Sequence, residues 1–200
     1  QAIAGEVPWF RSRQLLKIYP QFIKGKVIDL GGGGDKHRTF VNELPQVESY
    51  TNLDFYEKAD IVADLNEPLP IKDGQYDTAF CFAVLMYLKE PQAALNEAYR
   101  ILKPGSYFLL FAFWDFPYVG FPKDYFRFSS DGLKYMLNKS GFEIVTMFSV
   151  GGRMKILATF FITWFPFLKK FRSFIDKMAP VKKNKLDKDT PTYFVIAKRP

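Results

Sequence analysis

Apolar residues along the chain gather in seven short runs, separated by polar or glycine-containing segments. Runs of this length that are rich in β-branched and aromatic residues are typical of strands buried in a sheet. The pattern therefore predicts strands at 26–30, 49–55, 59–65, 76–83, 107–113, 142–150 and 192–199.

Between these runs the apolar positions take the spacing of helices. Helices are expected over 9–22, 39–44, 91–102 and 129–141. The stretch KPGS, 103–106, is expected to be a turn, because proline presets one dihedral angle and glycine supplies the unusual one. Strands that alternate with helices predict an α/β fold with a doubly wound, mostly parallel sheet. We expect a single domain over 1–200, with its core at about 25–150 and 191–200 and a helical insertion at 151–190.

The first predicted strand ends in VIDLGGGGDKH, residues 27–37, where four glycines follow each other. In a doubly wound sheet ligands bind beyond the carboxyl ends of the strands, and a glycine turn there lets backbone N–H groups come close to a ligand. A phosphate-binding loop would end in Gly-Lys-Ser/Thr, which is absent. The dinucleotide pattern Gly-x-Gly-x-x-Gly fails too, since Lys36 is sixth from Gly31 and His37 is sixth from Gly32. The ligand type that remains possible is a small nucleoside without phosphates. The alternative is that the glycines form a simple turn without a ligand.

This segment resembles the first motif of class I S-adenosylmethionine-dependent methyltransferases, with Gly31 and Gly33 matching and Asp35 at the third glycine position. The similarity covers about 25–150 and includes RILKPGS, 100–106. It implies a Rossmann-like sheet of seven strands whose last strand is antiparallel, and S-adenosylmethionine as cofactor. Asp54 would accept the ribose hydroxyls, and Asp64 with Leu65 would lie near the adenine. The full set of cofactor-binding residues that we expect is Asp29, Gly31, Gly33, Asp54, Asp64, Leu65 and Phe82.

Single residues of this set also have structural interpretations. Asp54 could be an ordinary strand-end residue, and Asp64 could cap a turn at Asn66. Cys81 is expected to be a small buried hydrophobic residue and His37 a helix-terminal residue. With one cysteine and one histidine, the chain is expected to hold neither an internal disulfide nor a metal, which suits a reducing compartment such as the cytoplasm.

The acceptor of the methyl group should be met by the loop after the fifth strand, residues 114–130, which is long and aromatic. Its segment DYFRFSS and the residues that follow resemble a bacterial methyltransferase subgroup associated with polysaccharide or glycolipid biosynthesis, although the histidine common there is missing. The first catalytic candidate is Asp124, as a base or as a residue that binds the acceptor, and Tyr125 is the second. Arg127 could bind a carboxylate or phosphate of the acceptor through its planar guanidinium. The alternative is that Asp124 and Arg127 form an ion pair that pins the loop.

The positive charge lies in the last quarter of the chain. Residues 1–150 hold 16 Lys and Arg against 18 Asp and Glu, net −2, and residues 151–200 hold 12 against 3, net +9. The stretch 154–178 has apolar and aromatic residues at helical spacing, with Pro166 inside it. It is too short to span a bilayer and suits a helix lying on a membrane surface. A lid, an extra core layer or a dimer contact are the alternatives.

Together these features indicate a methyltransferase, cytoplasmic or peripheral to the membrane, that acts on an oxygen of a glycan, glycolipid or related small molecule. Methylation of a lipid or quinone is the first alternative, and a non-catalytic cofactor-binding scaffold is the second. A tRNA or protein acceptor is a further alternative. A nucleic-acid base is disfavoured as acceptor because no Asn/Asp-Pro-Pro-Tyr motif is present. The oligomeric state is left open.

Overall fold

A computed structural model describes residues 12–34, 36–56, 58–116, 118–150, 164–165, 190 and 192–200. Within them, seven strands form one sheet in the order β3-β2-β1-β4-β5-β7-β6. Their bounds are β1 (Gly25–Leu30), β2 (Val47–Asp54), β3 (Ile61–Val62), β4 (Tyr76–Phe82), β5 (Leu102–Phe113), β6 (Glu143–Val150) and β7 (Thr192–Lys198).

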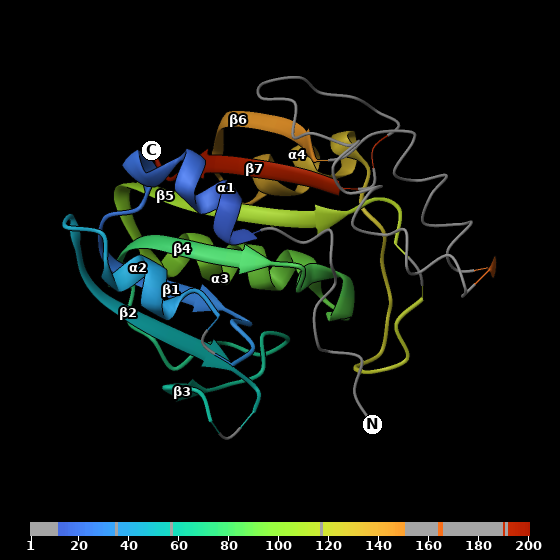
Figure 1. Ribbon diagram of the computed structural model, residues 1–200, viewed down its shortest axis with the longest axis horizontal. Helices are drawn as coiled ribbons and strands as arrows, with labels where there is room; N and C mark the ends of the chain where they lie inside the picture. Colours follow the sequence, from blue (N-terminus) through green and yellow to red (C-terminus); the bar gives the residue numbers. More distant parts are fainter. Residues whose placement is uncertain are drawn as a thin grey trace.

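The sheet is parallel except at one strand. β1 pairs in parallel with β2 and β4, β2 with β3, and β4 with β5, whereas β7 lies antiparallel between β5 and β6. The carboxyl ends of β1, β2, β4 and β5 therefore meet at one edge of the sheet, on the right in Figure 1. This topology confirms the predicted doubly wound α/β sheet with its last strand antiparallel.

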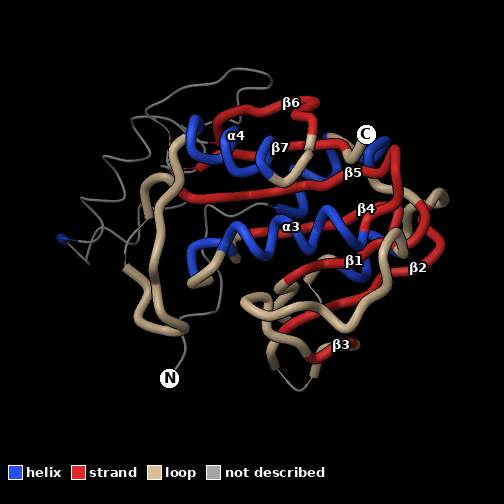
Figure 2. Tube along the Cα trace, turned by 180° about the vertical axis from the view of Figure 1, so that it is seen from behind, coloured by secondary structure: helices blue, strands red, loops and turns tan. Residues whose placement is uncertain are grey.

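Helices cover both faces of the sheet. The α-helices are α1 (Ser12–Ile18), α2 (Arg38–Asn42), α3 (Pro91–Ile101) and α4 (Ser130–Lys139), and two 3₁₀ turns are η1 (Pro20–Phe22) and η2 (Leu85–Tyr87). Helices α1 and α2 lie on the face seen in Figure 1, and α3 and α4 lie on the opposite face, seen in Figure 2. Helix α3 packs through an apolar side whose members recur every three or four residues, namely Pro91, Ala94, Leu95, Ala98 and Ile101.

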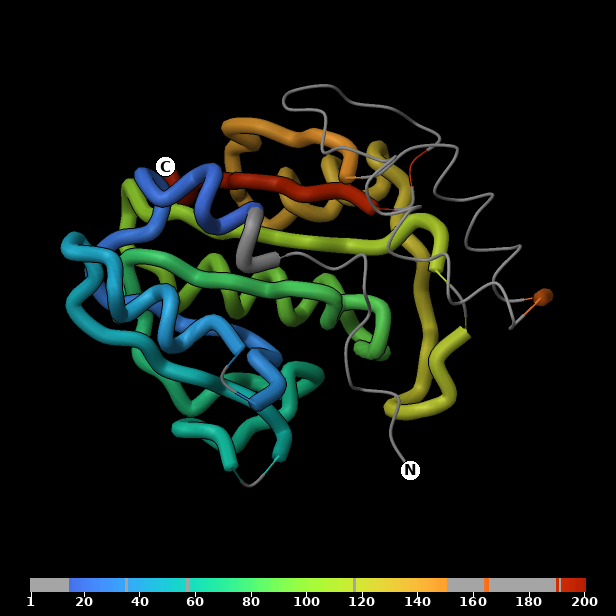
Figure 3. The backbone as a smooth tube through the Cα atoms, in the orientation of Figure 1, coloured from blue at the N-terminus to red at the C-terminus, as the bar shows by residue number. Residues whose placement is uncertain are grey.

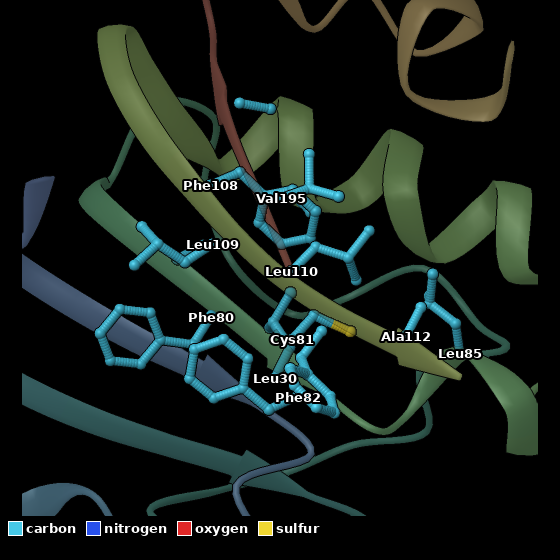
Figure 4. Packing of buried hydrophobic residues seen from close by; sticks show 14 of the residues in the cluster. Leu30, Phe80, Cys81, Phe82, Leu85, Phe108, Leu109, Leu110, Ala112 and Val195 are labelled. Carbon is cyan, nitrogen blue, oxygen red and sulfur yellow. The ribbon is translucent and has the colours of Figure 1, made fainter. Parts of the chain in front are cut away.

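The core runs along the central strands, which are buried on both sides because helices cover both faces. Figure 4 shows side chains of β1, β4, β5 and β7 packed against one another. Cys81 of β4 is 2% exposed, and burial raises the pKa of its thiol, which confirms that it is a buried apolar residue without reactive character.

Three elements differ from the predictions. The helix expected over 9–22 ends at Ile18, and the separate 3₁₀ turn η1 follows it at Pro20–Phe22. The third strand was expected over 59–65, but β3 contains only Ile61 and Val62. At its beginning, the side chain of Asp60 takes the Asn52 N–H (2.7 Å) that a longer strand would pair. The expected turn at 103–106 is part of β5 instead. There the register jumps from Tyr76↔Leu102 to Thr78↔Tyr107, so the glycine and proline make a bulge within the strand.

The predicted insertion lies almost entirely outside the described residues. The structure describes Trp164 and Phe165, whose side chains are exposed, and Thr190, which is buried. The helix that we expected over 154–178 therefore stays a prediction. In the part of the chain that is described, no helix has the length and apolar character needed to cross a bilayer.

Candidate cofactor site and acceptor side

The glycine loop lies at the carboxyl end of β1 and is tied to the end of β2. The N–H of Gly31 donates to the Leu53 carbonyl at 2.7 Å. Gly31 and Gly33 have φ angles of +78° and +46°, a left-handed region where a Cβ is unfavourable. A Cβ on Gly32 would lie 2.3 Å from the Asn52 side-chain oxygen. The chain needs a bare backbone here because both its dihedral angles and its close approach to β2 leave no room for side chains.

Asp54 ends β2 directly beside this loop. The register pairs Leu30 of β1 with Leu53 of β2, so the two carboxyl ends are level. The Gly33 N–H donates to Asp54 Oδ2 at 3.0 Å, and the Tyr56 N–H lies 3.4 Å from Oδ1. A carboxylate offers about four acceptor positions, so Asp54 retains capacity for hydroxyl donors. The fold thus brings together two residues that are 21 positions apart in the sequence.

Beneath the loop, Asp29 anchors a buried polar group. Its Oδ2 atom lies 2.7 Å from His37 Nδ1 and accepts a 2.7 Å hydrogen bond from the Tyr50 hydroxyl. His37 stands at the start of α2, as predicted, but it is also only 4% exposed, with its ring edge-on to Phe82. The pattern of apolar residues gave no signal for this burial, because it depends on the loop folding back over β1.

Two oxygens next to the loop lack a hydrogen-bond partner among the described residues. They are Asp29 Oδ1 and Asn52 Oδ1, on directly paired positions of β1 and β2. Buried acceptors of this kind are usually satisfied, so their environment suits a ligand or water that brings hydrogen-bond donors.

The other expected cofactor residues lie at the same edge of the sheet. Asp64 Oδ1 accepts hydrogen bonds from the Asn66 N–H (2.9 Å) and side-chain amide (2.8 Å), so its carboxylate holds a local turn, as the structural interpretation predicted. Leu65 next to it is buried. Phe82, the last residue of β4, is buried and stacks on Phe80 with 5.2 Å between ring centroids. Leu65 and Phe82 are therefore buried apolar side chains at the edge of the sheet that also carries the glycine loop.

On the acceptor side, the loop between β5 and α4 crosses beyond the ends of β5 and β4, in yellow-green in Figure 3. It is fastened to the loop after β4, since the Tyr125 N–H donates to the Met86 carbonyl at 2.8 Å. Several of its aromatic side chains are exposed, namely Trp114, Tyr118, Phe121, Tyr125 and Phe126.

Asp124 and Arg127 form the ion pair that was the alternative to a catalytic role. Both guanidinium Nη atoms of Arg127 donate to the Asp124 carboxylate, the Nη2–Oδ2 contact at 2.7 Å. The Val119 N–H donates to the same carboxylate at 3.0 Å, and Arg127 also donates to the Phe116 carbonyl at 2.9 Å. Burial alone would raise the pKa of Asp124, but the hydrogen bonds from Arg127 and Val119 outweigh it and lower that pKa. This arrangement holds the loop and makes Asp124 a weak base.

A second carboxylate of this loop, Asp115, was not a candidate in the sequence analysis. Its hydrogen bonding contrasts with that of Asp124. Its Oδ2 atom is buried and has no hydrogen-bond partner among the described residues. Burial raises the pKa of Asp115, although the charge of Arg127 acts against it. Its position two residues after β5 was the available sequence signal, but nothing in the sequence distinguished it from Asp124.

Comparisons with known proteins bear on the fold and on the domain family. Residues 28–110 match the methyltransferase domain family, a range that contains the glycine loop and Asp54 but not the loop after β5. The structure resembles an S-adenosylmethionine-dependent methyltransferase from Mesorhizobium loti, with a TM-score of 0.61 and 16% identity over 93% of this chain and 96% of that one. The fold is that of the S-adenosylmethionine-dependent methyltransferases. The domain match and this structural neighbour support an enzyme of this class, which implies S-adenosylmethionine as cofactor.

Two further similar proteins show that neither the sequence match nor the fold specifies the reaction. The ubiquinone/menaquinone biosynthesis C-methyltransferase UbiE of Ruegeria sp. (strain TM1040) is 39% identical over 61 residues, which is 30% of this chain and 24% of that protein. The match thus spans about a quarter of that relative's length. The [4+2]-cyclase SpnF has a TM-score of 0.64 and 18% identity, over 94% of this chain and 80% of that one. Because a cyclase shares the fold, the reaction must be argued from the site.

The residues at the site fit S-adenosylmethionine. Its ribose carries hydroxyl donors, which match the remaining acceptor capacity of Asp54, and its ammonium group is a donor of the kind that the oxygens of Asp29 and Asn52 lack. Among the described residues, no group of three His, Cys, Asp or Glu side chains is placed to hold a metal ion.

Proposed function

We propose that this protein transfers the methyl group of S-adenosylmethionine to a small amphipathic acceptor. The contact between the Gly33 N–H and Asp54 carries the proposal, because it joins the two parts of a nucleoside site across two strands. Gly31, Gly33 and Asp54 hold the cofactor in this proposal, with Asp29 beneath the loop and Asp64, Leu65 and Phe82 around the adenine and its sugar. When bound, the cofactor supplies an activated methyl group, so the protein's main task is alignment.

Calorimetry tests the cofactor half of this proposal. Titration of the purified chain with S-adenosylmethionine and with its demethylated product should show one-site binding. Absence of any heat at millimolar ligand would contradict the proposal. Binding without turnover on any acceptor would favour the non-catalytic scaffold.

For the acceptor, an oxygen of a glycan, glycolipid or related small molecule is our proposal. The loop after β5 supports an acceptor with an apolar part, since its aromatic side chains are exposed at the edge where the cofactor site lies. Tyr125, a residue that is 41% exposed, is the proposed contact for this part. Asp124 and Arg127 shape the loop in this proposal rather than performing the chemistry, because they already neutralise each other.

Methylation of a quinone ring carbon is the second candidate, and the relative UbiE, a C-methyltransferase of ubiquinone and menaquinone biosynthesis by name, favours it. Incubation with labelled cofactor, an alkyl glucoside and a short-chain demethylmenaquinol would separate the two. Label on a glycoside oxygen supports the first candidate, and label on the quinol ring carbon supports the second. A peripheral position at the cytoplasmic face of a membrane would suit either acceptor.

A further inference from the structure

Asp115 lies at the edge of the sheet that carries the proposed cofactor site. Strand β5 ends at Phe113, beside β4, with Phe111 paired to Phe82. Asp115 follows two residues later, at the carboxyl edge that also carries the glycine loop. It falls outside the region matched by the methyltransferase domain family, in the part that would differ with the acceptor.

The hydrogen bonding of Asp115 contrasts with that of the other carboxylate in the same loop. Asp124 accepts from two guanidinium nitrogens and one backbone N–H. Asp115 Oδ2 is buried and accepts from no described residue. A buried carboxylate oxygen without a donor is unfavourable by itself and calls for a partner that arrives from outside.

The nearby charge does not satisfy this oxygen. Arg127 is the charged group that acts on Asp115, but its guanidinium is engaged with Asp124 and with the Phe116 carbonyl. Burial therefore dominates and raises the pKa of Asp115, while the pKa of Asp124 is lowered. Two carboxyl groups pushed in opposite directions are the arrangement by which one acts as a fixed charge and the other exchanges protons.

We propose that Asp115 is a catalytic base that binds a hydroxyl group of the acceptor and takes its proton. This inference rests on the proposed function and specifies its acceptor as a neutral hydroxyl compound, since a phosphate or carboxylate would be repelled by Asp115. The acceptor oxygen forms a bond to the methyl carbon while the carbon–sulfur bond breaks and its electron pair stays on sulfur. The hydroxyl proton passes to the Asp115 carboxylate and then to water, so charge and atoms balance.

Kinetics of Asp115→Asn test the proposal, with Asp131→Asn as a matched control on an exposed side chain of α4. An alkyl glucoside and catechol serve as hydroxyl probes with labelled S-adenosylmethionine. We expect kcat to fall about 100-fold in Asp115→Asn, with cofactor affinity unchanged, because this is the usual scale for losing a general base. In the wild type, kcat/KM should fall on the acid side, and this limb should be absent from the variant. Full activity of Asp115→Asn would overturn the proposal and leave the proposed function intact.

A second measurement does not depend on turnover. Carbon-13 NMR of the full chain, with Asp115→Asn used for assignment, reports the titration of the Asp115 carboxyl group. We expect a midpoint above the ordinary aspartate value of about 3.9, and a midpoint at or below that value would overturn the proposal. If the wild type binds S-adenosylmethionine but methylates neither probe, the hydroxyl acceptor and the role of Asp115 are both wrong, while cofactor binding stands.

Discussion

Among single residues, Asp54 carries the most weight in the cofactor site, because its carboxylate is largely buried and faces the Gly33 N–H. An acid at this position has two tasks. It holds the glycine loop in its strained shape and leaves acceptor capacity for hydroxyl donors. Both tasks depend on the same two oxygen atoms.

Replacing Asp54 by alanine should weaken S-adenosylmethionine binding by about 1–3 kcal/mol, the scale for losing hydrogen bonds to a charged acceptor. Calorimetry on the variant measures this change, and Asp131→Ala provides a control with an equivalent truncation at the surface. Equal affinity in Asp54→Ala and the wild type would show that the residue is an ordinary strand-end acid.

Asp124 should matter for stability, and in a pH-dependent manner. Its pKa is lowered in the folded protein, so the ion pair stabilises fully above the unfolded value of about 3.9 and loses its effect as pH falls through the lower folded value. We expect Asp124→Asn to lower the free energy of unfolding by about 1.5–3 kcal/mol at pH 7.

Urea titrations at several pH values measure this loss, and the difference between Asp124→Asn and wild type should shrink below about pH 4. If Asp124→Asn instead keeps its stability and loses turnover, Asp124 is the catalytic residue and the ion pair is incidental.

Among the elements, α3 has an unusual ending. It passes into β5 at Leu102 without a glycine cap, and its last carbonyls are met from the far end of the chain. Arg199, just after β7, donates to the carbonyls of Tyr99 (2.9 Å) and Arg100 (3.0 Å) and to that of Leu102, and its guanidinium lies over the Tyr99 ring at 4.6 Å. A cation at this end of a helix is also favoured by the helix dipole.

Arg199→Ala should therefore destabilise the fold by about 1.5–3 kcal/mol, since it removes charge-assisted hydrogen bonds from three carbonyl groups. Arg199→Lys keeps the charge but not the planar fork, so its melting temperature should fall between those of wild type and Arg199→Ala. Thermal melts of the three proteins give the melting temperatures, and chemical denaturation of wild type and Arg199→Ala gives the difference in free energy of unfolding. A melting temperature unchanged by both substitutions would mean that water satisfies these carbonyls equally well.

At the scale of the whole molecule, charge is distributed unevenly, with net −2 over residues 1–150 and net +9 over residues 151–200. The exposed aromatic side chains after β5 and those of Trp164 and Phe165 add apolar surface. A membrane contact through 154–178 would combine both features near a lipid-linked acceptor.

Liposome co-sedimentation tests this contact. Binding should rise with the fraction of anionic lipid and fall with salt, because each Lys or Arg near the surface contributes about 1 kcal/mol and is screened. Replacing Phe160, Phe161 and Trp164 by serine should abolish binding while the melting curve stays cooperative. Loss of the cooperative melt in this triple variant would instead assign these side chains to the core.

The sequence alone predicted the strands and helices and their order along the chain, because the apolar periodicity of a strand or helix is local. The six long strands, the four helices and the glycine turn were predictable in this way. The absence of Gly-Lys-Ser/Thr after the glycines excluded a phosphate-binding loop, and the cofactor was implied by the resemblance of this segment to the methyltransferase motif.

Tertiary structure decided what depends on contacts between distant segments. The register of β1 on β2 places Gly33 against Asp54, and the side chain of Asp60 shortens β3. The closure of the loop after β5 decides which of its carboxylates is paired. Asp124 pairs with Arg127 three residues away, whereas Asp115 Oδ2 is buried and accepts a hydrogen bond from no described residue. A carboxylate is a fixed charge or a base according to its surroundings, and those surroundings exist only in the folded chain.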